Sequence, residues 1–376
     1  MKKIFAILTL SLLALGAYAQ EAQKATSADY GYKQTGYMST PKLGAYIIGS
    51  YKYSDLAGAN GGPGFGARLI RAYVDGSIFG DFKYRLQVQL ASGTPHVKDY
   101  FIEWAKYKEF SVKVGQFKRA FTFENPMNPW DVGVGDFSFL VKKFAGFGDR
   151  LDEDNMGGRD QGIQFQGDLI PMGDGDSYRL IHYQIGMWNG QGINQVDANK
   201  DKDIIATLQV QPIKGLYLGV FGWKGSWVKA ATTTYTVAPD GTVTGNKKPA
   251  EELARRRLSA GFKFDRDNWT VRAEYAAAVF GEKQQILDAG RPNYVGSDAV
   301  YVTVGVPLYD WLKVYVKWDE YRAGATAATS HDMYSCAANF RLHKNLMFQL
   351  EYRRNENQLL PTPGYNEIWF QTYIRW

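Results

Sequence analysis

Cysteine and histidine are scarce in this sequence of 376 residues, which contains one cysteine and four histidines. The single thiol, Cys336, excludes an internal disulfide framework and any zinc or iron–sulfur site built from several cysteines. The four histidines are too few to favour a metal site built from histidines. Beyond residue 19 there is no run of about 18 apolar residues, so no transmembrane helix is expected there. Aromatic residues, in contrast, are abundant at 15%.

Residues 1–19 have the features of a secretory signal peptide. Two lysines precede an apolar run over 4–15, and Ala17-Tyr18-Ala19 matches an A-x-A cleavage site. We therefore expect export and a mature chain that starts at Gln20, with a formal charge of +4, because two lysines are removed from a total of +6. A membrane anchor is the alternative, and the apolar run is short for one.

Apolar and polar residues alternate with a period of two along the rest of the chain. In FKYRLQVQL (82–90) the apolar side chains share one face, and two bases and two glutamines share the other. This alternation is typical of half-buried strands, and no long segment shows helical spacing. We predict sixteen strands over residues 43–53, 67–79, 82–92, 97–107, 109–117, 160–167, 177–188, 203–211, 215–224, 253–264, 268–281, 298–306, 311–322, 331–340, 345–354 and 365–376.

The connections between these segments alternate between short and long. The short ones include 80–81, 108, 265–267, 307–310 and 341–344, and 168–176 is longer than the rest of its class. The long connections are 54–66, 118–159, 189–202, 225–252, 282–297 and 355–364. Alternation of this kind is typical of a transmembrane antiparallel up-and-down β-barrel with short periplasmic turns. We therefore predict an all-β barrel over 43–376, preceded by a polar periplasmic lead over 20–42.

The outward phase of the predicted strands is apolar and suits lipid. Tyrosine and tryptophan near the strand ends match the aromatic girdles of such barrels. Two bases, Arg68 and Arg256, are assigned to this outward phase at the outer strand ends, where they meet either lipid headgroups or ordinary rim water. Trp376, the last residue, lies on the apolar face. Outer-membrane assembly machinery recognises terminal aromatic residues of this kind, so it is an expected partner. Outer-membrane lipid and lipopolysaccharide are therefore expected partners.

The inward phase is polar throughout, as expected around a water-filled lumen. Its bases outnumber its acids by twelve to eight, which predicts a mild preference for anions. The alternative is that these charges mostly pair with one another. The bases are Arg71, Lys83, Arg85, Lys113, Arg255, Arg257, Lys263, Arg272, Lys313, Lys317, Arg353 and Arg375, and the acids are Asp75, Asp99, Glu103, Glu109, Glu274, Asp319, Glu351 and Glu367.

The longest connection, 118–159, is rich in Phe, Gly and Pro and too apolar to extend into water. We expect it to fold into the barrel as a constriction loop, with Lys142-Lys143 as the leading anion-attracting pair. A solvated pair on an outer loop is the alternative. The predicted channel-lining and anion-binding residues are Lys142, Lys143, Arg119, Lys118, Arg71, Lys83, Arg85, Lys113, Arg272, Lys313, Lys317 and Arg353.

No catalytic residue, metal site or cofactor is predicted. The segment 197–208 begins like a calcium-binding loop, but Lys202 occupies the position that requires glycine and Leu208 the position that requires glutamate. His182 and His331 have no nucleophile beside them on the same strand face. The basic residues lie within strands rather than on a patch or a tail, so nucleic acid is not an expected partner.

Several stretches resemble the phosphate-selective porin O/P family. They are VKDYFIEWAKYKEFSVKVGQFKRAFTFEN (97–125), GRDQGIQFQGDL (158–169), WNGQGINQVDANKDKDIIATL (188–208), VRAEYA (271–276) and YVTVGVPLYDWLKVYVKWDEY (301–321). The resemblance implies a sixteen-stranded, usually homotrimeric porin of the Gram-negative outer membrane. It also implies passage of phosphate or other small anions through a basic throat, to which only Lys118, after the family's Gln-Phe pair, can be assigned.

The sequence thus predicts a porin for passive diffusion of small hydrophilic solutes, with mild anion preference. An adhesin or receptor that acts through its outer loops, with a closed lumen, is the alternative, and the Thr- and Gly-rich loop 225–252 favours it. A ligand-gated uptake receptor is disfavoured because no separate plug domain is expected before the barrel.

Overall fold

The computed structural model describes residues 39–56, 63–91, 93–147, 157–237, 239–278 and 296–376. The predicted signal peptide and most of the predicted periplasmic lead lie outside these residues. No helix within the described ranges is long and apolar enough to cross a membrane.

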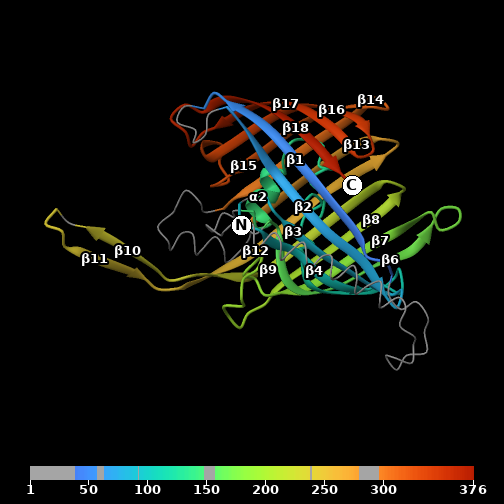
Figure 1. The fold of residues 1–376 in the computed structure, drawn as a ribbon, viewed down its shortest axis with the longest axis horizontal. Coiled ribbons are helices and arrows are strands. Elements are labelled where there is room, and N and C mark those ends of the chain that lie inside the picture. The colour runs from blue at the N-terminus through green and yellow to red at the C-terminus, as the bar shows by residue number, and fades with distance from the viewer. Residues whose placement is uncertain (1–38, 57–62, 92, 148–156, 238, 279–295) are drawn as a thin grey trace.

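Sixteen antiparallel strands form a closed barrel, in which each strand pairs with its neighbours and β1 pairs with β18 (Figure 1). The predicted fold class and strand number are therefore confirmed. The barrel strands are β1 (Lys42–Ser54), β2 (Gly64–Ile78), β3 (Phe82–Gln89), β4 (His96–Trp104), β5 (Ser111–Lys118), β6 (Arg159–Met172), β7 (Tyr178–Trp188), β8 (Asp203–Ile213), β9 (Leu216–Lys229), β12 (Glu251–Arg266), β13 (Trp269–Ala278), β14 (Asp298–Tyr309), β15 (Leu312–Arg322), β16 (Ser330–His343), β17 (Leu346–Asn357) and β18 (Gly364–Arg375).

Two further strands, β10 (Thr232–Val237) and β11 (Val243–Lys248), form a separate hairpin that projects far from the barrel (Figure 1). The long connection predicted over 225–252 therefore contains a hairpin that was not predicted from the sequence. β9 and β12 also continue their pairing to Lys229 and Glu251, beyond the predicted ends. The physical reason is the content of threonine, valine and tyrosine, which favour extended backbone.

Two turns differ from the predicted ones. β6 continues to Met172, which shortens the anomalous 168–176 connection to 173–177. Between β4 and β5, the turn covers 105–110 rather than the single residue Lys108. Aromatic and basic residues alternate through this turn, so the period-two pattern did not reveal where the strand ends. The end of the barrel that carries the short turns is called the short-turn end, and the opposite end, which carries the longer connections, is called the long-loop end.

Arg68 faces inward, which corrects its predicted outward position. Its guanidinium pairs with the Asp136 carboxylate inside the barrel at 2.7 Å. The cause is a β-bulge in β2, where Ile48 pairs with Leu69 but the next residue, Gly49, pairs with Ala67. The extra residue shifts the phase of the strand, and alternation alone cannot reveal such an insertion.

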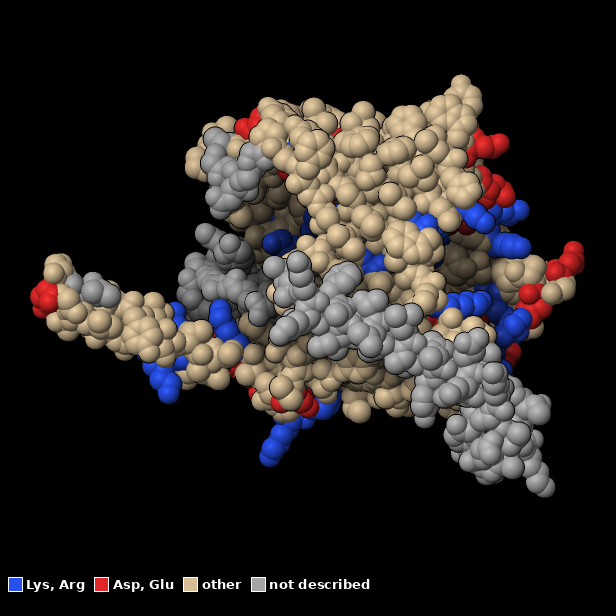
Figure 2. All heavy atoms as spheres, in the orientation of Figure 1, with Lys and Arg blue, Asp and Glu red and all other residues tan. Residues whose placement is uncertain are grey.

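The outer surface of the barrel is apolar between two charged ends. Exposed outward residues such as Leu86, Ile102, Leu208 and Leu258 form this band. On the face seen in Figure 2, Lys, Arg, Asp and Glu gather toward the ends, and the wall between them carries few charges. Cys336 is also exposed on this surface. Apolar side chains thus form the outer surface, whereas in a soluble protein they are mostly buried inside.

The two described helices are short. α2 (Phe139–Phe144) lies within the long connection between β5 and β6, inside the barrel (Figure 1). The 3₁₀ helix η3 (Ala327–Thr329) joins β15 to β16. We call residues 119–147, which contain α2, the inner loop.

Candidate functional site

The inner loop is buried against one side of the inner wall. Its aromatic and aliphatic side chains form the main apolar cluster together with wall residues from β8 to β16, and with Phe117 of β5 and Trp188 of β7. The loop members are Phe121, Phe123, Val132, Val134, Phe137, Leu140, Val141, Phe144 and Ala145. Burial of these rings explains why a segment so apolar leaves the long-loop end and enters the barrel.

Three carboxylates of the wall hold the backbone of the inner loop. Each lies on an inward position of β13, β15 or β17 and accepts amide hydrogens of the loop. The bonds are Phe123 N to Glu274 (3.1 Å), Phe139 N to Asp319 (2.9 Å) and Gly135 N to Glu351 (2.7 Å). Hydrogen bonds to charged acceptors are stronger than neutral ones, so these contacts fix the path of the loop.

Donors of the wall complete this arrangement by binding carbonyl groups of the loop. Asn339 and Gln349 both donate to the Gly133 carbonyl, at 2.9 and 3.0 Å. Arg257 donates to the Phe144 carbonyl at 2.8 Å. Gly133 has a φ of +98°, and a Cβ atom there would overlap the ring of Tyr315. The loop therefore contacts the wall too closely for any other residue at this position.

The wall that holds the loop is aromatic as well as polar. Phe221, Trp223, Tyr301 and Trp369 point inward and are almost completely buried. The prediction that the inward phase is polar throughout was therefore wrong for this side of the barrel. Period-two alternation shows which residues share a face, but it does not show that a second layer of protein covers that face.

Two acids of the inner loop, Glu124 and Asp136, are bound to neighbouring bases. Glu124 accepts the amide of Ser138 at 2.7 Å and lies 3.6 Å from the Lys317 ammonium. Asp136 pairs with Arg68 and with Lys142, each at 2.7 Å. Burial raises the pKa of Asp136, but Lys142 and Arg68 outweigh it and hold the pKa below the usual range. Both carboxylates are therefore neutralised locally.

The opposite side of the barrel, from β1 to β7, leaves an open hollow of about 310 Å³ along the inner loop. Its charged lining consists of five bases and one acid: Arg71, Arg85, Lys113, Lys118, Arg159 and Asp99. We call this hollow the basic crescent. The loop edge that faces it, Pro126-Met127-Asn128-Pro129, carries no charge.

The bases of the basic crescent differ in how far they are neutralised. Arg85 pairs with Asp75 at 2.6 Å, Lys113 with Glu103 at 3.1 Å and Arg159 with Asp99 at 2.8 Å. Arg71 instead donates to Gln89 and to the Tyr46 hydroxyl, both at 2.7 Å. Lys118 donates to the Met127 carbonyl. Arg71 and Lys118 therefore differ from the other three bases, because their hydrogen-bond partners are neutral.

The other predicted anion-binding residues lie elsewhere. Arg119 is completely buried against Asp160, and Lys317 is completely buried beside Asp319. Lys142 and Lys143 lie on α2, where Lys142 pairs with Asp136 and Lys143 lies over the ring of Tyr321. The remaining positions are Arg353 paired with Glu351, Arg272 paired with Asp265, Lys313 bonded to Thr270, and Lys83 exposed on β3.

Sequence reasoning missed two bases near the crescent. Arg159 opens β6 and lines the hollow, but its position next to a long connection made it a loop residue in the prediction. Lys98 is the extra residue at a register shift between β3 and β4, where Gln87 pairs with Asp99 and Val88 with Val97, and it is buried. A bulge of this kind leaves no trace in the alternation, so only the structure could place this lysine.

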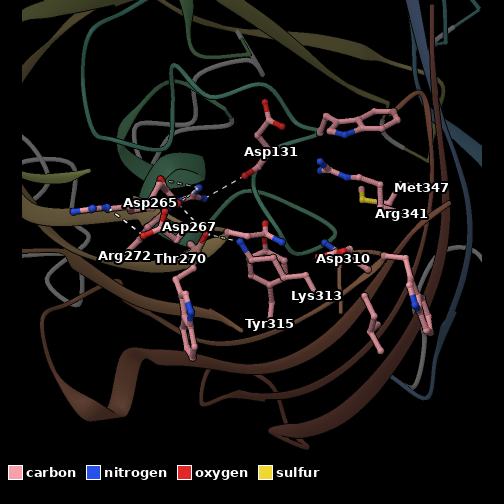
Figure 3. Close-up of a pocket in the computed structure, with 17 residues that line it drawn as sticks. Asp131, Asp265, Asp267, Thr270, Arg272, Asp310, Lys313, Tyr315, Arg341 and Met347 are labelled. Carbon is pink, nitrogen blue, oxygen red and sulfur yellow. Dashed lines mark hydrogen bonds and ion pairs between the residues drawn. The ribbon is translucent and has the colours of Figure 1, made fainter. Parts of the chain in front are cut away.

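A second hollow, of about 360 Å³, opens at the short-turn end (Figure 3). Four acids and four bases line it, and Figure 3 shows Asp265 next to Arg272 and Lys313 near Tyr315. Arg272 also donates to the Val132 carbonyl of the inner loop at 3.2 Å. In contrast to the basic crescent, this end has charges of both signs.

The candidate calcium and histidine sites have structural explanations. Asp197 pairs with Lys202 at 2.5 Å, so the lysine occupies the place of a cation. His182 binds Asp168 across two strands at 2.7 Å, a pair that same-strand reasoning missed. No hydroxyl of the described residues bonds to this imidazole. No group of three His, Cys, Asp or Glu side chains within the described ranges is placed to hold a metal ion.

The buried Arg119–Asp160 pair gives a stability prediction. Asp160 also accepts the amides of Gly190 and Gly192, at 2.9 and 3.2 Å. We expect Asp160→Ala to lower the free energy of unfolding by about 3–5 kcal/mol, because it leaves a buried guanidinium unpaired. Urea unfolding in detergent, followed by tryptophan fluorescence, measures this. The exposed Asp174→Ala variant is the control, and a loss below about 1 kcal/mol for Asp160→Ala would contradict the assignment.

Solved structures with the same fold are outer-membrane proteins. The anion-selective porin from Comamonas acidovorans superposes with a TM-score of 0.61 and 11% identity, over 90% of this chain and all of that one. OmpT of Vibrio cholerae with loop L8 deleted gives 0.60 and 13%, over 90% and 100%. OmpF of Salmonella typhi, in complex with daunomycin, gives 0.57 and 11%, over 89% and 97%.

No protein-family model matches the sequence, and no curated protein matches it. At these identities the structural likeness concerns the fold. The chain therefore has the closed sixteen-stranded barrel found in outer-membrane porins.

Proposed function

We propose that the protein is an outer-membrane porin that lets small hydrophilic solutes diffuse passively, with a mild preference for anions. The observation that carries this proposal is the basic crescent. One side of the inner wall is covered by the inner loop, whereas the side from β1 to β7 lines an open space with five bases and one acid. In this proposal the inner loop acts as the constriction, and solutes pass along its uncharged edge.

Electrostatics supports the anion preference. Rings of Lys and Arg favour anions in aqueous pores. Of the three acids of the inner loop, Glu124 and Asp136 are bound by Lys317, Lys142 and Arg68 away from the crescent. The third, Asp131, lines the second hollow. The inner loop has as many bases as acids, but because its acids are held away from the crescent this balance does not imply a neutral constriction. Phosphate is a candidate solute, which accords with the resemblance to the phosphate-selective porin O/P family, and that family assignment stays a prediction.

The proposal places the barrel in the Gram-negative outer membrane, reached through the predicted signal peptide at 1–19. The apolar outer band suits the lipid-facing zone of such a barrel. We further propose a homotrimer, with support from the trimer form of Vibrio cholerae OmpT, which superposes with a TM-score of 0.58. Trp376, exposed at the end of the chain, remains the proposed contact for the assembly machinery.

Planar-bilayer recordings test the proposal directly. We expect stepwise conductance increments from the purified protein, and in a salt gradient a reversal potential that indicates more permeation by chloride than by potassium. Absence of steps from correctly folded barrels would remove the porin function. Steps with cation preference would remove the anion assignment and keep the porin.

A surface-recognition function is the second candidate, and the projecting hairpin favours it. Every described side chain of β11 and most of β10 are exposed, and Tyr235 is 70% accessible. A hairpin without a core of its own is marginally stable in water, so a partner would stabilise it. Deletion of 232–248 separates the two functions, because it would abolish recognition and leave conductance unchanged.

A further inference from the structure

A strip of glutamine side chains runs along the inner wall next to the basic crescent. Exposed apolar residues such as Phe165 on β6 and Ile185 on β7 mark the outward phase of these strands, so the residues on either side of them face inward. Strand pairing places Gln166 of β6 opposite Gln184 of β7. We call the inward glutamines of β6, β7 and β8 the amide strip, which consists of Gln164, Gln166, Gln184 and Gln209.

The amide strip joins two open spaces inside the barrel. Gln164, Gln166 and Gln184 line the hollow of the basic crescent. Two residues further along β6 and β7, Asp168 and His182 line another hollow, of about 500 Å³, at the short-turn end. Two residues of a strand span only about 7 Å. A solute that leaves the crescent toward the short-turn end therefore passes the strip.

The hydrogen-bonding capacity of the amide strip is only partly used. Gln164 donates to Gln166, and Gln166 donates to the Glu103 carboxylate at 2.7 Å. The side chain of Gln184 forms a single hydrogen bond with the described residues, a long one of 3.5 Å to Gln166. Each glutamine amide has two N–H donors and a carbonyl oxygen that accepts. The half-buried Gln184 therefore has both a donor and an acceptor available to a solute.

The bases of the crescent also keep N–H donors for a solute. Arg71 donates through Nε and Nη1, whereas its Nη2 forms no hydrogen bond with another described residue. Lys118 has three N–H donors and gives one of them to a backbone carbonyl. Lys113 lies opposite Gln164 in the pairing of β5 with β6. Positive charge and the amide strip are therefore next to each other on the wall.

These two kinds of group suit a solute that has both a negative charge and hydroxyl groups. An anion without O–H groups satisfies the bases but gives no hydrogen to the carbonyl oxygen of an amide. A neutral sugar satisfies the amides but leaves the bases without an opposite charge. A hydroxyl group both donates and accepts, so it matches a glutamine amide.

We propose that the basic crescent and the amide strip bind and pass anionic sugars. The bases attract the carboxylate of the sugar, and Gln166 and Gln184 bind its hydroxyl groups on the way to the short-turn end. The crescent hollow of about 310 Å³ is within the size range of small-molecule sites. This inference rests on the proposed porin function and names a class of solute for it.

Block of the chloride current in planar bilayers tests the inference with three ring compounds. Galacturonate has both charge and hydroxyl groups, galactose has hydroxyl groups only, and cyclohexanecarboxylate has charge only. We expect galacturonate to half-block the current at a concentration at least about fivefold below that of cyclohexanecarboxylate, since one net hydrogen bond corresponds to a factor of roughly five. Galactose at the same concentrations should leave the current unchanged.

A double variant locates the hydroxyl contacts. Gln166→Leu combined with Gln184→Leu removes two amides of the strip and keeps every base of the crescent. In this variant galacturonate and cyclohexanecarboxylate should half-block the current at equal concentrations. Gln195→Leu combined with Gln358→Leu makes the same change in exposed loops and is the matched control, so it should keep the wild-type ratio.

Three results would overturn the inference. They are equal block of wild type by galacturonate and cyclohexanecarboxylate, block by galactose as strong as that by galacturonate, and a preference for galacturonate that persists in the Gln166→Leu, Gln184→Leu variant. The wild-type comparison decides the question even if the double variant does not insert into the bilayer. A channel that conducts chloride without preferring galacturonate loses this inference alone, whereas a folded protein that does not conduct loses the porin function.

Discussion

Replacing Arg71 and Lys118 together by glutamate is expected to abolish the anion preference of the channel. The two substitutions change the charged lining of the basic crescent from five bases and one acid to three of each. One unit charge at 4 Å contributes about 1 kcal/mol even in water. We therefore expect the anion-to-cation permeability ratio to fall at least about fivefold, since 1 kcal/mol corresponds to a factor of roughly five.

Controls separate this effect from a general loss of charge. Lys247→Glu with Lys248→Glu makes the same charge change on the projecting hairpin, and its reversal potential should equal that of wild type. Arg71→Gln with Lys118→Gln should give an intermediate ratio, because only half the change is made. The measurement is the reversal potential in a tenfold salt gradient. If the glutamate pair leaves the ratio unchanged while both proteins conduct, solutes do not pass along the crescent.

The sequence was sufficient to predict the barrel because alternation and turn spacing are local properties. Strand number, antiparallel order and the inward position of Arg85 and Lys113 all follow from a period of two. The inward positions of Arg68 and Lys98 were not predicted, because in each case a bulge inserts one residue and shifts the phase of the strand. The local sequence pattern does not distinguish such a bulge from a continuous strand.

The candidate site depended on long-range contacts, which alternation does not contain. The content of Phe, Gly and Pro indicated that residues 118–159 would turn inward, and the inner loop does lie against the wall. Which side of the wall it covers depends on pairs such as Gly135 with Glu351, 216 residues apart. The side that remains open, and so the bases that a solute could meet, could be learned only from these contacts.

Glu351→Ala is expected to release the inner loop from the wall and to increase both the single-channel conductance and its noise. Glu351 accepts the Gly135 amide at 2.7 Å and pairs with Arg353 at 2.9 Å. Arg353 in turn lies 3.5 Å over the ring of Trp369. Alanine removes the acceptor and leaves the buried guanidinium with only the Glu367 carboxylate, 4.0 Å away. Breaking a buried pair costs about 3–5 kcal/mol in comparable cases.

The expected rise in conductance is roughly twofold, because conductance depends on the width of the narrowest aqueous section. Glu351→Gln distinguishes a local contact from general destabilisation. The glutamine amide oxygen can still accept the Gly135 amide, so the loop should stay in place and the conductance should remain close to wild type, although the pairing with Arg353 is weakened. If glutamine and alanine raise the conductance equally, the ion pair with Arg353 positions the loop. If neither changes it, the contacts at Glu274 and Asp319 hold the loop without Glu351.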